Sequence, residues 1–441
     1  MNKKENATRV NRRAFNKTAV GLTTGIAAAY GPFSSRVLGA NDKVVMGAIG
    51  LRYRGTTVSK ELMQTGCVEF AACCDVDKRE NDKYVQLMKD QHDARIEPYR
   101  DFRELIDRND IDAVLIATPD HWHAIPFIFA CEAGKDVFVE KPFSHNIMEG
   151  RAMVNAARKF RTVAQVGTWQ RSTQHFQDAI DFVRSGQLGT ISVCRAWRVR
   201  NSEGVGHMPP TNPPEGLDWD FWLGPAPYTP YRSNRCHFDW RWYFDYAGGE
   251  TADHGAHMLD IVCLAMGDWD PIEVSSFGGS YVIDDDRDTP DTQVAIYRFK
   301  DFTMTWEVRW GNARPVDGFP SGLGSEWIGR NGTLGVNRGR WKFFPEKGVE
   351  NIEPTTVTEL KTNHFQNFID CVKSRSTPRS DVESSHKTAV LCHLANVSFR
   401  TGKKLEWDSD REVIVNEPSA MECPHYQREY RAPWTLPMNQ T

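Results

Sequence analysis

Short apolar segments alternate with helical segments through residues 43–167, a pattern that few folds accommodate. Each apolar segment is almost continuous, as expected of a strand that is covered on both faces of a sheet. The segments are residues 43–49, "VEFAACCD" ending at Asp75, residues 111–120, residues 135–142, and "TVAQVG" near Gly167. Helical segments lie between them, among them residues 56–64. This alternation predicts an α/β domain with a doubly wound parallel sheet.

The first apolar segment runs into a glycine turn. "GLRYRG" matches the dinucleotide-binding fingerprint G-x-G-x-x-G at Gly50 and Gly55, but Arg52 stands in place of the middle glycine. The glycines of this fingerprint let the backbone turn tightly and approach a pyrophosphate. An arginine at a position that requires positive φ costs roughly 1 kcal/mol or more, whereas its guanidinium can bind a phosphate oxygen. We therefore expect a dinucleotide-binding loop with altered geometry.

Asp75 ends the second apolar segment, twenty residues after Gly55. A carboxylate at this place binds the adenosine ribose hydroxyls in NAD-binding domains. It therefore predicts NAD as the cofactor, and the nearby Lys78 and Arg79 leave NADP as the alternative. A plain turn aspartate at the end of a strand would also fit.

Two further patterns carry groups suited to acid–base chemistry. Lys141 follows a predicted strand in "VEKPF", and ligands of open α/β sheets bind beyond the carboxyl ends of the strands. In "GGETADHGAHMLD", Asp253 and His257 are four residues apart on a predicted helix and can share a face. A carboxylate beside an imidazole raises its basicity, as a general base requires. Read singly, the same residues also fit a surface lysine, a helix cap and a buried core histidine.

Taken together, these motifs resemble those of the Gfo/Idh/MocA oxidoreductases. The resemblance covers nearly all of the chain after residue 40 and includes "ATPDHWHA", "AGKDVFVEKP", "DWDFWLGPAP" and "GGETADHGAH". It implies a Rossmann domain followed by an α/β domain with a large, mostly antiparallel sheet, through whose open face many relatives pair. A homo-oligomer, dimer or tetramer, is therefore expected.

The resemblance also implies roles for particular residues. The catalytic residues would be Lys141, Asp253 and His257. The cofactor-binding residues would be Gly50, Arg52, Arg54, Gly55, Asp75, Thr118, Pro119, His123, Glu140 and Lys141.

The second half of the chain offers two patterns of its own. In "TMTWEVRW", alternation predicts a strand with Met304, Trp306, Val308 and Trp310 on one face. Residues 201–246 are dense in aromatic side chains, which either stack on sugar rings in a carbohydrate cleft or fill the core.

The N-terminal segment "NRRAFNKTAVGLTTGIAAAY" resembles a twin-arginine export signal, with Arg12 and Arg13 as the pair. A disordered basic tail is the alternative. The signal predicts a periplasmic protein, in which the cofactor is bound before export and regenerated in place. We divide the chain into a signal and linker (1–40), an NAD(P)-binding Rossmann domain (41–167) and a substrate-binding and oligomerisation domain (168–441).

Composition excludes several other classes. The net charge is −4 and no basic stripe is present, so a nucleic-acid partner is not expected. No apolar run reaches the length of a membrane span. The ten cysteines form no C-x-x-C pair, and we expect buried, free thiols. His121 and His123 lack further ligands nearby in the sequence, and no metal site is predicted.

The sequence thus predicts an exported, NAD-dependent oxidoreductase that transfers hydride between a secondary alcohol of a sugar, polyol or glycoside and a tightly bound nicotinamide cofactor. His257 would accept the hydroxyl proton, Lys141 would stabilise the alkoxide, and Asp253 would orient the imidazole. One alternative is an NAD-dependent, redox-neutral glycoside hydrolase, although such relatives carry Thr-His where this chain has "ADHGAH". The other is a non-catalytic sugar-binding scaffold, which Arg52 favours and the intact catalytic set opposes.

Overall fold

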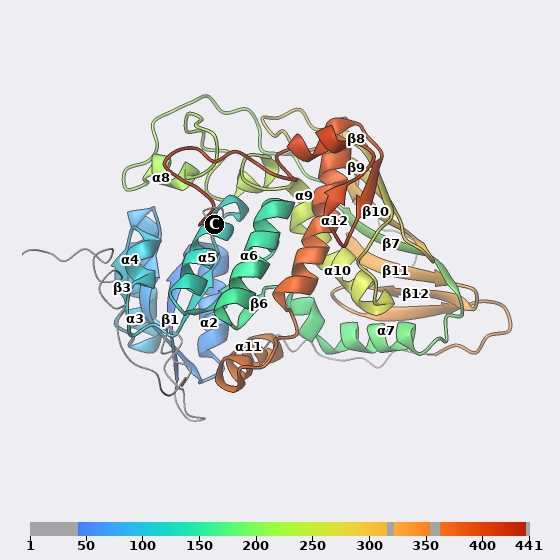
Figure 1. Ribbon diagram of the computed structural model, residues 1–441, viewed down its shortest axis with the longest axis horizontal. Coiled ribbons are helices and arrows are strands. Elements are labelled where there is room, and N and C mark those ends of the chain that lie inside the picture. Colours follow the sequence, from blue (N-terminus) through green and yellow to red (C-terminus); the bar gives the residue numbers. More distant parts are fainter. Residues whose placement is uncertain (1–42, 315–321, 353–361, 438–441) are drawn as a thin grey trace, which may run out of the picture. The chain divides into compact units, whose positions relative to one another are not determined.

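The computed structural model describes residues 43–314, 322–352 and 362–437. The proposed export signal and linker at residues 1–40 lie outside these ranges. Within them, the strands form a six-stranded sheet and a nine-stranded sheet (Figure 1). No helix of this described part is both long and apolar enough to cross a bilayer.

The six-stranded sheet is parallel throughout. In spatial order its strands are β3 (Glu97–Tyr99), β2 (Val68–Cys74), β1 (Val44–Ile49), β4 (Ala113–Ile116), β5 (Asp136–Val139) and β6 (Ala164–Val166). The strand order reverses between β1 and β4, as in a doubly wound Rossmann sheet, so the predicted fold is confirmed. The short edge strand β3 was not predicted, and β4 and β5 are shorter than the apolar segments that contain them.

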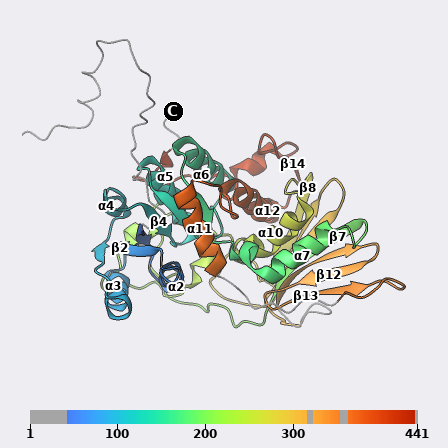
Figure 2. The ribbon, with the colours of Figure 1, turned by 90° about the horizontal axis from the view of Figure 1, so that it is seen from below.

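Helices cover both faces of this sheet. They are α2 (Tyr53–Met63), α3 (Lys78–His92), α4 (Phe102–Ile106), α5 (Ala124–Glu132), α6 (Ile147–Phe160) and, from near the C-terminus, α11 (Thr362–Ser374). Phe365 and Phe368 of α11 pack in one cluster with Val58 and Leu62 of α2. The C-terminal part of the chain therefore also completes the core beside the parallel sheet, as Figure 2 shows for α11.

The nine-stranded sheet is antiparallel except for the parallel pair β7–β10. In spatial order its strands are β13 (Trp341–Pro345), β12 (Gly332–Val336), β11 (Leu323–Gly329), β7 (Ile191–Val199), β10 (Thr303–Arg309), β9 (Thr292–Arg298), β8 (Glu273–Gly279), β14 (Leu405–Asp408) and β15 (Val413–Ile414). The predicted alternation in β10 is confirmed, because Met304, Trp306, Val308 and the following Trp310 are all buried. The prediction of a large, mostly antiparallel sheet is confirmed as well.

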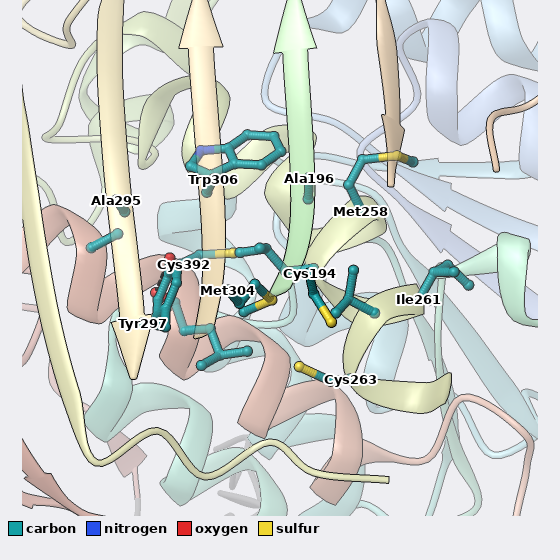
Figure 3. Packing of buried hydrophobic residues seen from close by; sticks show 14 of the residues in the cluster. Cys194, Ala196, Met258, Ile261, Cys263, Ala295, Tyr297, Met304, Trp306 and Cys392 are labelled. Atoms are coloured by element: carbon teal, nitrogen blue, oxygen red, sulfur yellow. Dashed lines mark hydrogen bonds between the residues drawn. The ribbon is translucent and has the colours of Figure 1, made fainter. Parts of the chain in front are cut away.

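One face of the large sheet is covered by helices. These are α7 (Gln174–Arg184), α10 (Gly255–Met266) and α12 (Val382–Thr401), which lie along the same side of the sheet in Figure 2. In Figure 3, Met304 and Trp306 of β10 and Cys194 of β7 meet Met258 of α10 and Cys392 of α12. All ten cysteines are free and nine of them are buried, which confirms the prediction of free thiols.

The opposite face of the large sheet is open. Phe277 on β8 is 70% exposed, and Val294 and Ile296 on β9 are 41% and 45% exposed. This is the face through which the sequence predicts pairing, and the homo-oligomer stays a prediction.

Candidate functional site

The turn after β1 keeps two of the three glycine roles in the fingerprint. Gly50 has φ 83°, and a Cβ there would lie 2.7 Å from the backbone of Ala117. A Cβ on Gly55 would lie 1.9 Å from the carbonyl oxygen of Gly50, so α2 can approach the end of β1 only with glycine at this position. Both positions therefore require glycine.

Arg52 has an ordinary extended backbone at the N-cap of α2, with φ −68° and ψ 162°. The expectation of strain at this residue was wrong, because the residue with positive φ in this turn is Gly50. Arg52 can therefore be accommodated without a backbone penalty, and its exposed side chain can approach an anion at the start of α2.

A cavity of about 520 Å³ opens beyond the carboxyl ends of β1, β2 and β4. This is the switch point of the sheet, where doubly wound folds bind dinucleotides. Six of the predicted cofactor-binding residues line it, namely Gly50, Arg52, Arg54, Asp75, Thr118 and Pro119. The N-terminus of α2 and two arginine side chains give this end of the cavity a positive potential, which suits a pyrophosphate.

Asp75 ties the turn after β1 to the end of β2. Its Oδ2 accepts a hydrogen bond from the N–H of Leu51 at 2.9 Å, and its Oδ1 accepts one from the N–H of Asp77 at 3.0 Å. Burial raises the pKa of Asp75. The carboxylate therefore shapes the loop in addition to bordering the cavity, and its contact with a ribose stays a prediction.

The two cations beside β2 are already paired with carboxylates. Lys78 Nζ lies 2.6 Å from an oxygen of Asp82, and Arg79 lies 2.5 Å from an oxygen of Asp77. Neither is placed as a free partner for a ribose phosphate, and this arrangement favours NAD over NADP.

His123 and Glu140 support the cavity without bordering it. The ring nitrogens of the buried His123 lie 2.8 Å from the carbonyl oxygen of Pro142 and 3.0 Å from that of Thr118. The buried Glu140 accepts a hydrogen bond from Arg54 Nε at 2.8 Å. We therefore assign both residues to holding the surrounding loops, in place of the direct cofactor contact expected from the motifs.

Residues 216–246, which we call the strap, include α8 (Trp219–Leu223), which is labelled in Figure 1. Phe221, Trp222, Phe238 and Trp240 of the strap line the cavity. Other strap residues pack among themselves in a separate apolar cluster that includes Tyr243 and Tyr246. The aromatic segment noted in the sequence therefore builds a small core and lines the dinucleotide cavity, and its stacking on a sugar ring stays a prediction.

The strap is held beside β2 by its own contacts. The N–H of Asp218 donates to the carbonyl oxygen of Val76 at 3.0 Å, and the N–H of Lys78 donates to that of Gly216 at 2.9 Å. His237 Nε2 lies 2.8 Å from Asp77 Oδ2.

Near α5 a second anchor holds the strap. Trp122 Nε1 donates to the carbonyl oxygen of Trp222 at 2.9 Å. The strap, which forms one wall of the cavity, is therefore anchored on both sides.

Two of the predicted catalytic residues, Lys141 and Asp253, meet beside the strap. Lys141 follows β5, and its Nζ lies 2.5 Å from Asp253 Oδ1 and 2.9 Å from the carbonyl oxygen of Asp253. Arg241, which lines the cavity, approaches Asp253 Oδ1 to 3.6 Å, so the pair lies next to the lining of the cavity. Burial alone would raise the pKa of Asp253, but Lys141 and His254 hold it well below its usual range. Asp253 is therefore an anion that fixes the ammonium group of Lys141.

The expected pairing of Asp253 with His257 is absent among the described residues. The predicted helix is broken at His254, since α9 (Gly249–Asp253) ends before it and α10 begins after it. The carboxylate of Asp253 is taken by Lys141 and by His254, whose Nδ1 lies 3.1 Å from Asp253 Oδ2. The role of Asp253 as an orienter of the imidazole is therefore corrected to that of an orienter of Lys141.

His257 is buried, and its Nδ1 has no hydrogen-bond partner within the described part of the chain. Burial, together with the charges of Arg338 and Lys141, holds the pKa of His257 well below its usual range. The ring is thus neutral at neutral pH and has one nitrogen that can accept a proton.

Sequence reasoning missed Glu250 and His254. His254 Nδ1 lies 2.8 Å from Glu250 Oε2, which extends the series Lys141–Asp253–His254 by one carboxylate. The four-residue spacing of Glu250 and His254 was visible in "GGETADHGAH", but their link to Lys141 exists only in the folded chain.

Glu250, Asp253 and His254 also place one potential metal-ligand atom each within 4.8 Å of one another. Cations already surround these carboxylates, because Lys141 contacts Asp253 while Arg198 and Arg200 approach Glu250 to 3.4 and 3.5 Å. We therefore interpret the group as an ion-pair network.

This network predicts a pH-dependent contribution to stability. Burial alone would lower the pKa of His254, but Glu250 and Asp253 raise it above the usual value. Such a histidine stabilises the fold fully below its unfolded-state pKa of about 6.5, and the contribution is lost as pH rises through the raised folded-state value. We expect urea unfolding of wild type and His254→Gln to differ most at slightly acidic pH and to converge at alkaline pH. His92→Gln, at an exposed helix end, is the control, and a difference that does not vary with pH would contradict the assignment.

Two family models match this chain. The NAD-binding Rossmann fold of an oxidoreductase family matches residues 44–168, and the C-terminal alpha/beta domain of the same family matches residues 181–307.

Individual relatives agree with these models. Myo-inositol 2-dehydrogenase of Thermotoga maritima is 24% identical over 388 residues, which cover 84% of this chain and 99% of that protein. A glycosyl hydrolase family 109 protein of Shewanella pealeana is 32% identical over 171 residues, so that the chain spans about 38% of the length of that relative.

Among solved structures, the WlbA dehydrogenase from Bordetella pertussis, in complex with NADH and UDP-GlcNAcA, has the same fold. Its TM-score is 0.61 at 20% identity, over 83% of this chain and 99% of that one. Because the two family models together match more than half of its residues, this chain belongs to the Gfo/Idh/MocA oxidoreductase family.

Proposed function

We propose that this protein transfers hydride between a secondary alcohol of a sugar, polyol or glycoside and an NAD cofactor that stays bound through the catalytic cycle. The observation that carries the proposal is the contact of Lys141 with Asp253 beside the dinucleotide cavity, with the buried His257 on the following helix. The relatives support the substrate class, since one is named an inositol dehydrogenase and one structure holds NADH with a sugar nucleotide.

Each of these residues has its own role in the proposed reaction. When bound, NAD supplies the hydride acceptor. Lys141 donates a hydrogen bond to the substrate oxygen and stabilises the negative charge that develops there. Neutral His257 accepts the hydroxyl proton. Asp253 holds the Nζ of Lys141 in place.

The strap supports retention of the cofactor. A dinucleotide in the cavity would have to leave past aromatic side chains that are anchored on both sides by the contacts of His237 and Trp222. Retention suits an exported enzyme, because outside the cytoplasm there is no NAD pool. We propose export to the periplasm on the basis of the Arg12–Arg13 segment alone.

Arg52 should contribute to this retention. Because its backbone is unstrained, Arg52→Gly removes a cation at the start of α2 and relieves nothing. We expect NAD to be lost about three- to tenfold faster, which is less than a buried charged hydrogen bond would give because the side chain is exposed. The difference from wild type should shrink as salt rises. Arg95→Gly, an exposed arginine away from the cavity, is the control, and slower NAD loss from Arg52→Gly would overturn the assignment.

The proposal is tested on the purified full-length chain. Denaturation should release NAD or NADH, identified by mass, and adding a sugar or polyol to the native protein should produce bound NADH, followed by its absorbance. Release of NADP would contradict the cofactor assignment. Protein that neither carries nor binds a dinucleotide would establish the non-catalytic scaffold.

The glycosyl hydrolase relative favours a second candidate, a redox-neutral glycoside hydrolase. The two functions differ in their products. A hydrolase should cleave an aryl glycoside with no net change in bound NAD, whereas a dehydrogenase should accumulate a ketone and NADH.

We also propose that copies of the chain associate through the open face of the large sheet. The exposed apolar residues Phe277, Val294 and Ile296 support this interface. Light scattering should report a dimer or tetramer, and Phe277→Asp should shift it toward the monomer. A monomeric wild type would contradict the proposal.

A further inference from the structure

Two arginines at the end of β7 face the catalytic group. Along β7, Cys194 and Ala196 are buried in the core beneath the helices, and by strand alternation Arg198 continues that face. Arg200 lies two residues further along. Their Nε atoms approach Glu250 Oε1 to 3.4 and 3.5 Å, from Arg198 and Arg200 respectively.

Glu250 does not satisfy the hydrogen-bonding groups of these two arginines. Both Nε atoms and Glu250 Oε1 are buried, and none of the three has a hydrogen-bond partner among the residues that the structure describes. Buried donors of a charged group normally find an acceptor. The two arginines therefore share one carboxylate, Glu250, in long ion pairs, and the two positive charges exceed its single negative charge.

Arg200 is held with its plane fixed. Its guanidinium carbon lies 3.5 Å from the ring centroid of Trp310 and 5.0 Å from that of Trp242. Within the described ranges its guanidinium makes no hydrogen bond, and its Nε has the long ion pair with Glu250. A guanidinium held against aromatic rings with donors that make no hydrogen bond is suited to binding a carboxylate.

The guanidinium of Arg200 is linked to the proposed reacting groups through two carboxylates. Arg200 approaches Glu250, and Glu250, Asp253 and His254 place their polar atoms within 4.8 Å of one another. Asp253 in turn contacts Lys141 at 2.5 Å. The carboxylates of Glu250 and Asp253 therefore link Arg200 to Lys141.

The other charged groups around Arg200 leave an excess of positive charge there. Arg241 adds a further cation and approaches Asp253 to 3.6 Å. Asp239 interacts with both Arg200 and Arg241, but burial raises its pKa and so weakens its compensation of these cations. Arg287 is occupied by Asp285 at 2.7 Å.

We propose that the substrate is a sugar that carries a carboxylate, a uronic acid or its glycoside, and that Arg200, assisted by Arg198, binds this carboxylate while Lys141 and His257 act on a ring hydroxyl. The proposal rests on the dehydrogenase function above and specifies its substrate class.

Matched sugar pairs that differ only at C6 test the proposal, glucose with glucuronate and galactose with galacturonate. Binding of each to the NADH-loaded full-length protein is measured by calorimetry, which needs no turnover. We expect the uronate of at least one pair to bind about 10- to 100-fold more tightly than its neutral partner, the value of a hydrogen-bonded charge pair. Turnover of the same sugars by the NAD-loaded protein is measured in parallel.

Variants then locate the carboxylate. Arg200→Gln should remove most of the preference for the uronate, and Arg200→Lys should keep part of it because the charge remains. Arg309→Gln, on the neighbouring strand β10, is the matched control and should keep the full preference. Retained NADH and the melting temperature show that each variant is folded.

The possible failures are distinguishable. Equal binding of both members of every pair, or an unchanged preference in Arg200→Gln, overturns the inference. If neutral sugars are oxidised as well as uronates, the inference fails and the dehydrogenase function stands. If the protein holds no dinucleotide, the proposed function itself fails.

Discussion

Replacing Lys141 with alanine should lower the rate of sugar oxidation by roughly 10²–10⁴-fold while the protein still carries NAD. The ammonium group lies 2.5 Å from Asp253 Oδ1, and in the proposed mechanism it donates to the substrate oxygen. Its loss removes transition-state stabilisation and leaves the carboxylate of Asp253 without its main partner, so the pKa of Asp253 should rise.

The measurement is the rate of NADH formation on the NAD-loaded protein, together with the amount of NAD released on denaturation. Lys387→Ala, an exposed lysine paired with Asp270 at 3.0 Å, is the control and should match wild type. Turnover like that of wild type in Lys141→Ala would refute the proposed mechanism. Loss of NAD together with activity would show that Lys141 acts mainly in binding the cofactor.

Replacing Gly55 with alanine should abolish retention of NAD. The new Cβ would lie 1.9 Å from the carbonyl oxygen of Gly50, and this contact joins two backbone segments, so that no side chain can move aside. Relief requires α2 to move away from β1, which displaces the N-terminus of the helix from the pyrophosphate site. Overpacking of this kind also destabilises a fold by about 1–3 kcal/mol.

The readouts are the NAD content of the purified protein and the midpoint of urea unfolding. Gly339→Ala is the matched control, because the nearest atom to its Cβ, Oδ1 of Asn337, lies at an ordinary 3.5 Å. Gly55→Ala protein with full NAD content would show that the turn after β1 tolerates a shift of α2 and that the dinucleotide binds elsewhere.

The sequence was sufficient for the parts of the fold that depend on local pattern. Continuous apolar segments placed β1, β2, β4, β5 and β6, because strands covered on both faces need apolar side chains throughout. Alternation placed β10 and its buried face. The edge strand β3 was not predicted, because its three residues, "EPY", are largely exposed and have no apolar pattern.

The glycines that the turn requires could also be predicted from a local pattern. Gly50 and Gly55 are fixed by backbone geometry within one turn, and the fingerprint encodes that geometry. Arg52 was misjudged because the fingerprint does not state which of its residues has positive φ, and here only Gly50 does so within the turn from 50 to 55.

The arrangement of the catalytic group depended on contacts between distant residues. The helical spacing of Asp253 and His257 suggested a pair, yet Lys141, 112 residues away in sequence, takes the carboxylate. A charged Nζ delivered by the end of β5 is a stronger partner than a neutral ring on the next helix, and only the tertiary structure brings it there. The link between His237 and Asp77 that anchors the strap spans 160 residues and has no local signature either.

What the chain encodes locally, then, is the parallel sheet, the glycine turn and the identities of Lys141, Asp253 and His257, because each follows from burial pattern or backbone geometry over a few residues. Folding decided which of these groups touch and that Glu250 and His254 join them. It also decided that an aromatic strap lines the cavity and that Arg200 lies against Trp310 and beside Glu250. Hydrogen bonds and ion pairs of this kind depend on a few ångströms between segments far apart in the chain, and residue spacing along a sequence carries no information about that distance.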